Sequence, residues 1–157
     1  MIRSLLITFF TIFVFISAVQ AADPFESTLC ASGTMTVIHS SKELTVVGFE
    51  LKGSARSNTN SEIYNNASEW CVGVLRQMGD EWAQNGYCKY LYPNGDYHIG
   101  EWSGDSKGGN WKFLFGTGKW EGIKGGGKWS MLQRFKPIAP GTIQNCRIIE
   151  GTYELSK

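Results

Sequence analysis

The chain has 157 residues, with 15 basic and 14 acidic side chains, a formal net charge of +1, 42% hydrophobic residues and 13% aromatic residues. This apolar content is too high for an intrinsically disordered chain, and the near-neutral charge balance argues against a nucleic-acid partner. The length suits one compact domain, which can bury a hydrophobic core without help from a metal or a cofactor. We therefore expect a single globular domain that holds no cofactor.

The N-terminal segment has the pattern of a secretory signal peptide. Arg3 precedes an apolar stretch at residues 5–19, and Val19 and Ala21 occupy the two positions that a signal peptidase reads. An apolar helix of about fifteen residues spans roughly 22 Å, which is shorter than a hydrocarbon core of about 30 Å. We expect residues 1–21 to be removed, so that a secreted or periplasmic domain of residues 22–157 remains, with no membrane span after cleavage.

The remaining sequence predicts an all-β domain. Short runs of alternating apolar and polar residues are bounded by Gly, Asn, Asp and Ser, and there is little helical periodicity. The predicted strands lie near residues 33–39, 44–52, 70–76, 86–91, 97–102, 110–115, 127–133 and 148–155. Because closure removes exposed sheet edges, we favour one antiparallel β-barrel of about eight strands over a two-sheet β-sandwich. The polar run at residues 53–66 predicts a mobile surface loop.

An even number of cysteines in an exported chain indicates two disulfides. The four cysteines are Cys30, Cys71, Cys88 and Cys146. Three connectivities are open, and we favour Cys71 with Cys88, because each lies in a short strand-like run beside the turn-rich segment 78–86. This pairing leaves Cys30 to bond Cys146. A zinc site is not expected, since the sequence has no Cys-x-x-Cys pair and no histidine at ligand-like spacing from a cysteine.

The C-terminal half contains a regular repeat. Gly-x-Trp occurs four times at intervals of nine residues, with the glycines at Gly100, Gly109, Gly118 and Gly127. Nine residues make one short strand and one tight turn, so the repeat predicts a β-meander with a glycine near each strand start. Lysines adjacent to three of the tryptophans predict that the tryptophans point inward and the lysines outward, because neighbouring side chains in a strand face opposite sides.

Motifs that resemble catalytic sites have simpler explanations as turns. The segment 104–108 matches Gly-x-Ser-x-Gly, but a glycine-rich hairpin loop explains it without a nucleophilic serine. Asp96, His98 and Glu101 could act as an acid or a base if they faced a cavity. Asn94 and Gly95 directly before them are a strong hairpin signal, so a turn explains Asp96 equally well. We therefore assign no catalytic residue.

The aromatic residues of the C-terminal half are the best candidates for a ligand site. Core packing explains most of them, yet tryptophan is rarely fully buried, and several tryptophans in one small barrel commonly mean that some line a mouth. The candidate ligand-binding residues are Tyr97, Trp102, Trp111, Trp120 and Trp129.

Several glycine-rich segments carry a family resemblance. They are Asn94–Asp96, Gly109–Phe113, Gly116–Gly127 and Gly151–Tyr153, together with Cys71–Gly73 and Tyr87–Cys88. This pattern resembles small exported bacterial proteins related to the allene oxide cyclase and dirigent barrels. The resemblance implies an eight-stranded antiparallel, calycin-like barrel with a central cavity. Plant relatives hold an oxidised fatty acid or phenoxy radicals in that barrel, but their catalytic residues do not map onto this chain.

Three functions follow from these observations. The first is binding of a small apolar or aromatic ligand inside the barrel. The second is a barrel filled by its own side chains that acts as an envelope or protein-interaction module. The third is a cyclase or isomerase, which lacks support because the sequence shows no convergent acid, base or nucleophile.

Overall fold

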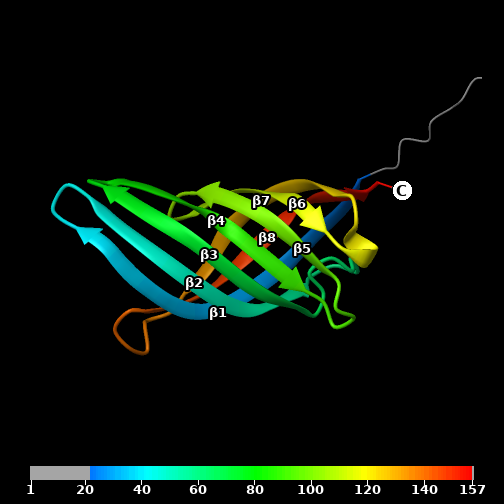
Figure 1. Ribbon diagram of the computed structural model, residues 1–157, viewed down its shortest axis with the longest axis horizontal. Helices are drawn as coiled ribbons and strands as arrows, with labels where there is room; N and C mark the ends of the chain where they lie inside the picture. The colour runs from blue at the N-terminus through cyan, green and yellow to red at the C-terminus, as the bar shows by residue number, and fades with distance from the viewer. Residues whose placement is uncertain (1–21, 157) are drawn as a thin grey trace, which may run out of the picture.

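The computed structural model describes residues 22–156, which form a closed antiparallel barrel in which each strand pairs with its sequence neighbours (Figure 1). The elements are β1 (Asp23–Ser40), β2 (Thr45–Ser57), β3 (Ala67–Met78), β4 (Glu81–Leu91), β5 (Tyr97–Gly104), β6 (Gly108–Gly116), the 3₁₀ helix η1 (Gly118–Trp120), β7 (Ile123–Arg134) and β8 (Thr142–Leu155). The predicted all-β barrel is confirmed. The predicted signal peptide at residues 1–21 lies outside the described residues.

Pairing of β1 with β8 closes the barrel, and it also lengthens the first strand. β1 begins at Asp23 rather than near residue 33, because its first half alternates buried and exposed residues and pairs with β8 from Tyr153 backwards. Phe25 and Leu29 thereby enter the core. The sequence pattern located all eight strands but underestimated the length of each.

Both predicted disulfides are present, and they lie on opposite sides of the barrel wall. Cys71 and Cys88 face each other across β3 and β4 and are buried inside the barrel. Cys30 and Cys146 face each other across β1 and β8, and Cys30 is exposed on the outer surface. The second disulfide therefore locks the two strands whose pairing closes the barrel.

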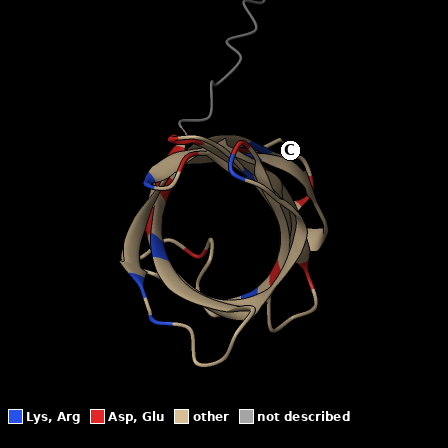
Figure 2. Ribbon diagram, turned by 90° about the vertical axis from the view of Figure 1, so that its left-hand side faces the viewer, with Lys and Arg blue, Asp and Glu red and all other residues tan. Residues whose placement is uncertain are grey.

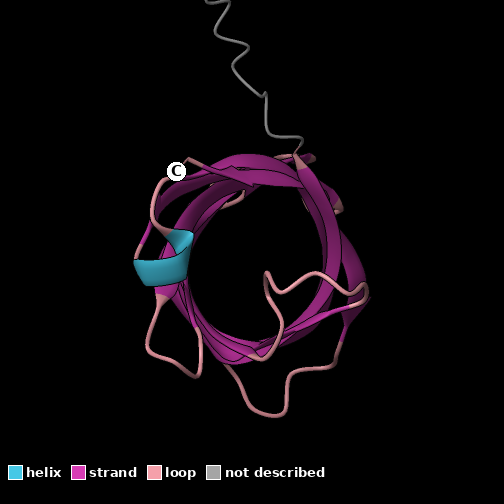
Figure 3. Ribbon diagram, turned by 90° about the vertical axis from the view of Figure 1, so that its right-hand side faces the viewer, coloured by secondary structure: helices cyan, strands magenta, loops and turns pink. Residues whose placement is uncertain are grey.

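One end of the barrel is filled by the loop that joins β2 to β3. This loop turns inward across the ring of strands in Figure 3, and Ile63 and Tyr64 are completely buried in it. The prediction of a mobile surface loop over residues 53–66 is therefore wrong. Residues 53–57 belong to β2, and the two large side chains near the end of the loop enter the barrel. They are easy to overlook within a run that is otherwise polar.

The Gly-x-Trp repeat builds strands at three of its four units. Trp102, Trp111 and Trp129 lie on the inner side of β5, β6 and β7. The prediction fails at the third unit, where Trp120 belongs to the helix η1. Gly118 adopts a φ of +53°, a conformation that favours glycine, and the carboxylate of Asp96 accepts a hydrogen bond from the next backbone N–H.

The opposite end of the barrel carries four connections between strands and remains open. Acidic and basic residues both occur around the ring of strands seen from this end (Figure 2). The Gly-x-Ser-x-Gly segment forms the β5–β6 hairpin here, and Asp105 accepts hydrogen bonds from the backbone N–H groups of Lys107 and Gly108. Over residues 22–156, no helix has the length and apolar character needed to cross a membrane.

Candidate functional site

A cavity of about 340 Å³ occupies the open half of the barrel. Its wall is mainly apolar and aromatic, with contributions from all strands; representative residues are Val47, Phe49, Leu75, Trp82, Met131 and Ile143. Ligand pockets in proteins generally combine such an apolar wall with a few polar groups. The cavity is therefore the candidate functional site of the described chain.

Three of the five aromatic residues proposed from the sequence line this cavity. They are Trp102, Trp111 and Trp129. Tyr97 lies on the outer face of β5, where the Lys89 ammonium is 4.0 Å from the centre of its ring. Trp120 is buried at the closed end. Strand alternation explains the position of Tyr97, because its neighbour His98 points inward.

Two glycines make room for Trp102 against the wall of the cavity. Gly73 and Gly86 are paired across β3 and β4, and a Cβ atom at either position would lie 2.8 Å or less from the Trp102 indole. The indole also stacks on Phe49, with ring centres 5.9 Å apart. A side chain at either glycine would clash with the indole and with a backbone carbonyl of the neighbouring strand, so both glycines are needed for Trp102 to lie where it does.

A buried ion pair forms the floor of the cavity. The Arg147 Nη2 group donates to both carboxylate oxygens of Glu69, at 2.6 and 2.7 Å. The Glu69 side chain is fully buried, whereas Arg147 lines the cavity. Removal of one partner from such a pair leaves an uncompensated buried charge, which is costly. The two residues are therefore expected to act as one unit.

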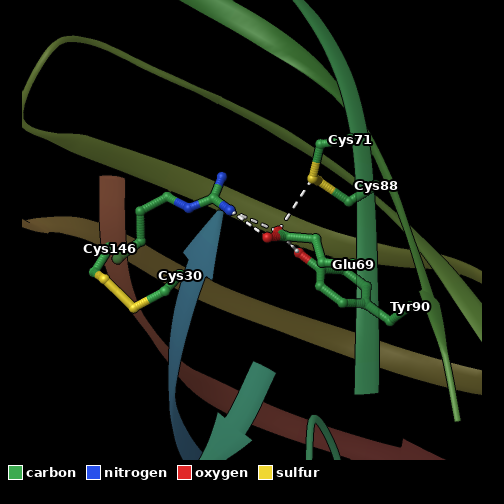
Figure 4. A network of polar contacts seen from close by, with 7 residues as sticks. Cys30, Glu69, Cys71, Cys88, Tyr90 and Cys146 are labelled. Atoms are coloured by element: carbon green, nitrogen blue, oxygen red, sulfur yellow. Dashed lines mark hydrogen bonds and ion pairs between the residues drawn. A yellow bond between two sulfur atoms is a disulfide. The ribbon is translucent and has the colours of Figure 1, made fainter. Parts of the chain in front are cut away.

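Tyr90 and the inner disulfide complete this floor (Figure 4). The Tyr90 hydroxyl donates to Glu69 Oε1 at 3.1 Å, and burial, followed by the nearby carboxylate, holds its pKa well above the ordinary value. The Sγ atom of Cys71 also lies 3.1 Å from this oxygen. A disulfide sulfur carries no proton, so the last contact is packing rather than a hydrogen bond. Tyr90 thus remains a neutral donor to a charged acceptor.

Glu69 and the two cysteines of the inner disulfide resemble a metal site by distance alone. One ligand atom each from Glu69, Cys71 and Cys88 lies within 4.8 Å of the others. However, the two sulfur atoms are bonded to each other. Metal ligation by cysteine requires a thiolate, so this group cannot bind a metal through sulfur while the disulfide is intact.

None of the three polar residues considered for acid or base chemistry belongs to this floor, although Glu101 lines the cavity and His98 stacks on Tyr90. Asp96 accepts hydrogen bonds from Asn94 and from the backbone of Lys119, as a turn residue does. Glu101 forms an ion pair with Lys112 at 2.7 Å. His98 is completely buried at the closed end, where its Nδ1 lies 3.2 Å from the Tyr92 hydroxyl.

Burial holds His98 neutral. It lowers the pKa of the imidazole to about 3. The Tyr92 hydroxyl accepts a hydrogen bond from the Tyr64 backbone N–H, and either it or His98 Nδ1 donates in the contact between these two groups. His98 is a structural residue of the closed end; it does not line the cavity, but its ring stacks on that of Tyr90, which does, with ring centres 4.9 Å apart.

Glu69, Tyr90 and Arg147 are not among the candidate residues expected from the sequence, although the sequence contains a signal for them. Glu69 lies two residues before Cys71 and Tyr90 two residues after Cys88, and strand alternation puts each on the same face as its cysteine. Arg147 adjoins Cys146, and it faces inward because that disulfide lies outside. The signal requires knowing which disulfide is inside the barrel, which the spacing alone does not reveal.

No family model and no curated protein matches this sequence. Three solved chains match the structure. One is the pterocarpan synthase dirigent protein GePTS1, with a TM-score of 0.54, 9% sequence identity, and coverage of 94% of this chain and 100% of that chain. At this identity the similarity concerns the fold alone. The predicted likeness to dirigent barrels is confirmed at that level, whereas a bacterial origin and the allene oxide cyclase grouping remain predictions.

Proposed function

We propose that this protein is an exported barrel that binds a small, mainly apolar or aromatic molecule in its open half. The observation that carries the proposal is the asymmetric filling of the barrel. Aromatic side chains and the β2–β3 loop pack one half, while the other half keeps a cavity of about 340 Å³ with an apolar wall. A barrel filled from end to end would suit the alternative of a pure interaction module.

The proposed binding surface consists of the three tryptophans that line the cavity, Trp102, Trp111 and Trp129. Their rings offer large, flat apolar surfaces with few rotatable bonds, which favours aromatic ligands. The rings of Trp102 and Trp129 meet edge to face, with centres 6.0 Å apart and an angle of 84° between their planes, so they form a corner rather than a stack. No reaction is proposed for the cavity.

Export is part of the proposal. Two disulfides are typical of chains that fold in an oxidising compartment, and both are formed here. The predicted signal peptide supplies the route. Mass spectrometry of the protein from its host would test this, with a mature start at Ala22 as the expected result.

Ligand binding is tested by native mass spectrometry of the folded protein from the same source, followed by titration of the identified compound. We expect an additional small-molecule mass that disappears on denaturation. In the titration, Trp102→Leu should weaken binding at least about tenfold, because it removes one aromatic wall of the cavity.

Trp70→Leu is the matched control. Trp70 is 52% exposed on the outer face of β3 and does not line the cavity, so its loss should leave the affinity unchanged. Equal losses in both variants would contradict a site inside the barrel. A bare polypeptide mass under several growth conditions would favour the interaction module.

A further inference from the structure

No charged residue of the described cavity lining presents an unpaired charge to the interior of the cavity. Arg147 is the only one of them at the floor within the described chain, and both of its contacts with Glu69 are shorter than 2.8 Å. The Glu69 side chain is fully buried behind it. The charge of Arg147 is already matched by a buried carboxylate, so no net charge is left for an anionic ligand, while its Nε–H has no hydrogen-bond partner within residues 22–156.

The charged groups of the two other charged lining residues have their partners outside the cavity interior. The carboxylate of Glu101 pairs with Lys112, whose side chain is exposed on the outer wall. Arg134 is exposed at the mouth, where its guanidinium donates to the backbone carbonyl of Ser106. Water and salt screen a charge in that position. Neither residue supplies a counter-ion to the cavity interior.

The uncharged polar residues of the lining are mostly carboxamides. They are Gln77, Gln84, Gln144 and Asn145. A carboxamide both donates and accepts hydrogen bonds. The side-chain oxygen of Asn145 has no hydrogen-bond partner within residues 22–156, and the same is true of the indole N–H groups of Trp102 and Trp111. These atoms are buried, so the side chains must rotate before they offer a ligand an acceptor and donors. The amides of Gln77 and Gln84 already donate to the backbone carbonyls of Gly79 and Asp105, and Gln144 shares the outer face of β8 with Cys146.

We infer that the cavity selects ligands whose polar group is uncharged and both donates and accepts hydrogen bonds, such as a carboxamide, and that it rejects carboxylates. This inference rests on the proposed function and specifies the ligand class for the same site. The physical reason is that a carboxylate would enter an apolar space without a free cation, and its desolvation would not be compensated. A neutral amide loses much less hydration and meets partners of both kinds.

The inference is tested on the wild-type protein with three probes that share one ring system: 2-naphthamide, 2-naphthoate and 2-methylnaphthalene. Equilibrium dialysis at pH 7 gives the three dissociation constants. We expect naphthamide to bind most tightly, at least about tenfold more tightly than naphthoate. Equal affinities, or tighter binding of naphthoate, would overturn the inference and leave the proposed function intact. Absence of binding by all three probes would instead contradict the proposed function.

A second test removes the negative charge of the floor with Glu69→Gln. The variant keeps the shape of the side chain but leaves the Arg147 charge unmatched, so naphthoate should bind at least about tenfold more tightly than to the wild type. Glu50→Gln is the matched control, because Glu50 pairs with Lys52 on the outer surface. An unchanged naphthoate affinity in a folded Glu69→Gln protein would overturn the inference. If this variant does not fold, the affinities of the three probes for the wild-type protein still test the inference.

Discussion

The two ends of this barrel are built from the same strands, yet one is packed and the other is hollow. At the closed end, Tyr64 contacts Phe25 and His98, and it also contacts Tyr90 and Trp111, which lie between the packed end and the cavity; the ring centres of these pairs lie 4.7 to 5.6 Å apart. At the open end, Phe135 and Ile138 are exposed on the β7–β8 loop. Aromatic residues of one small barrel are thus divided between core packing at one end and the cavity wall at the other, and Tyr90 and Trp111 take part in both.

The largest expected effect comes from breaking the packed end. Tyr64→Ala should lower the free energy of unfolding by about 3–5 kcal/mol, because it empties a fully buried aromatic position. Urea denaturation followed by circular dichroism measures this loss. Phe135→Ala at the open end is the control and should change stability by less than about 0.5 kcal/mol, since this ring is 52% exposed. Comparable losses at both ends would refute the division.

The dependence of the unfolding free energy on pH should test the packed end separately, because His98 is buried there. Burial lowers the pKa of this histidine in the folded state to about 3 from an ordinary value of 6.5. Between these two values the unfolded chain binds a proton that the folded chain does not. The stability should therefore fall as the pH is lowered through this window, by up to about 1.4 kcal/mol per pH unit.

His98→Phe should remove this contribution and flatten the dependence of unfolding free energy on pH. Denaturation curves at several pH values between 6.5 and 3 provide the slope. The matched control is His39→Phe on the exposed end of β1, which should retain the wild-type slope. An unchanged slope in His98→Phe would show that the closed end admits a charged histidine.

The smallest expected change in stability belongs to the cavity wall. Met131→Ala removes a half-buried side chain that lines the cavity, so the unfolding free energy should fall by only about 1 kcal/mol. Binding of a cavity ligand should nevertheless weaken severalfold, because the ligand loses part of its apolar wall. Denaturation and equilibrium dialysis on the same preparation measure both quantities. A large loss of stability with unchanged binding would show that Met131 contributes to core packing rather than to the ligand site.

The fold class, the number of strands and the disulfides could be predicted from the sequence, because they depend on local alternation and on the number and placement of the cysteines. Contacts between residues far apart in the sequence could not be predicted. Glu69 and Arg147 are 78 residues apart, and neither stands out in its own segment. Ile63 and Tyr64 were hidden in a polar run for the same reason, since what buries them is the lumen of a barrel that closes elsewhere.

The apolar pattern of β3 does not reveal which of its faces is buried. Trp70, Val72 and Val74 form an alternating apolar set that looks like a core face, but all three are exposed. Their neighbours Glu69 and Cys71 face inward instead. The inner disulfide fixes this orientation, because a strand with Cys71 inside must carry every second residue on the same side.

Pairing of β1 with β8 brings together the first and last strands of the chain, which the outer disulfide joins across 116 residues. Until β8 has been synthesised, β1 and β7 each present an unpaired edge that other chains can join. Barrel closure through such distant segments is characteristic of proteins that fold in milliseconds to seconds rather than microseconds. The last fourteen-residue strand therefore completes the fold, and a chain interrupted before Thr142 would retain two edges open to aggregation.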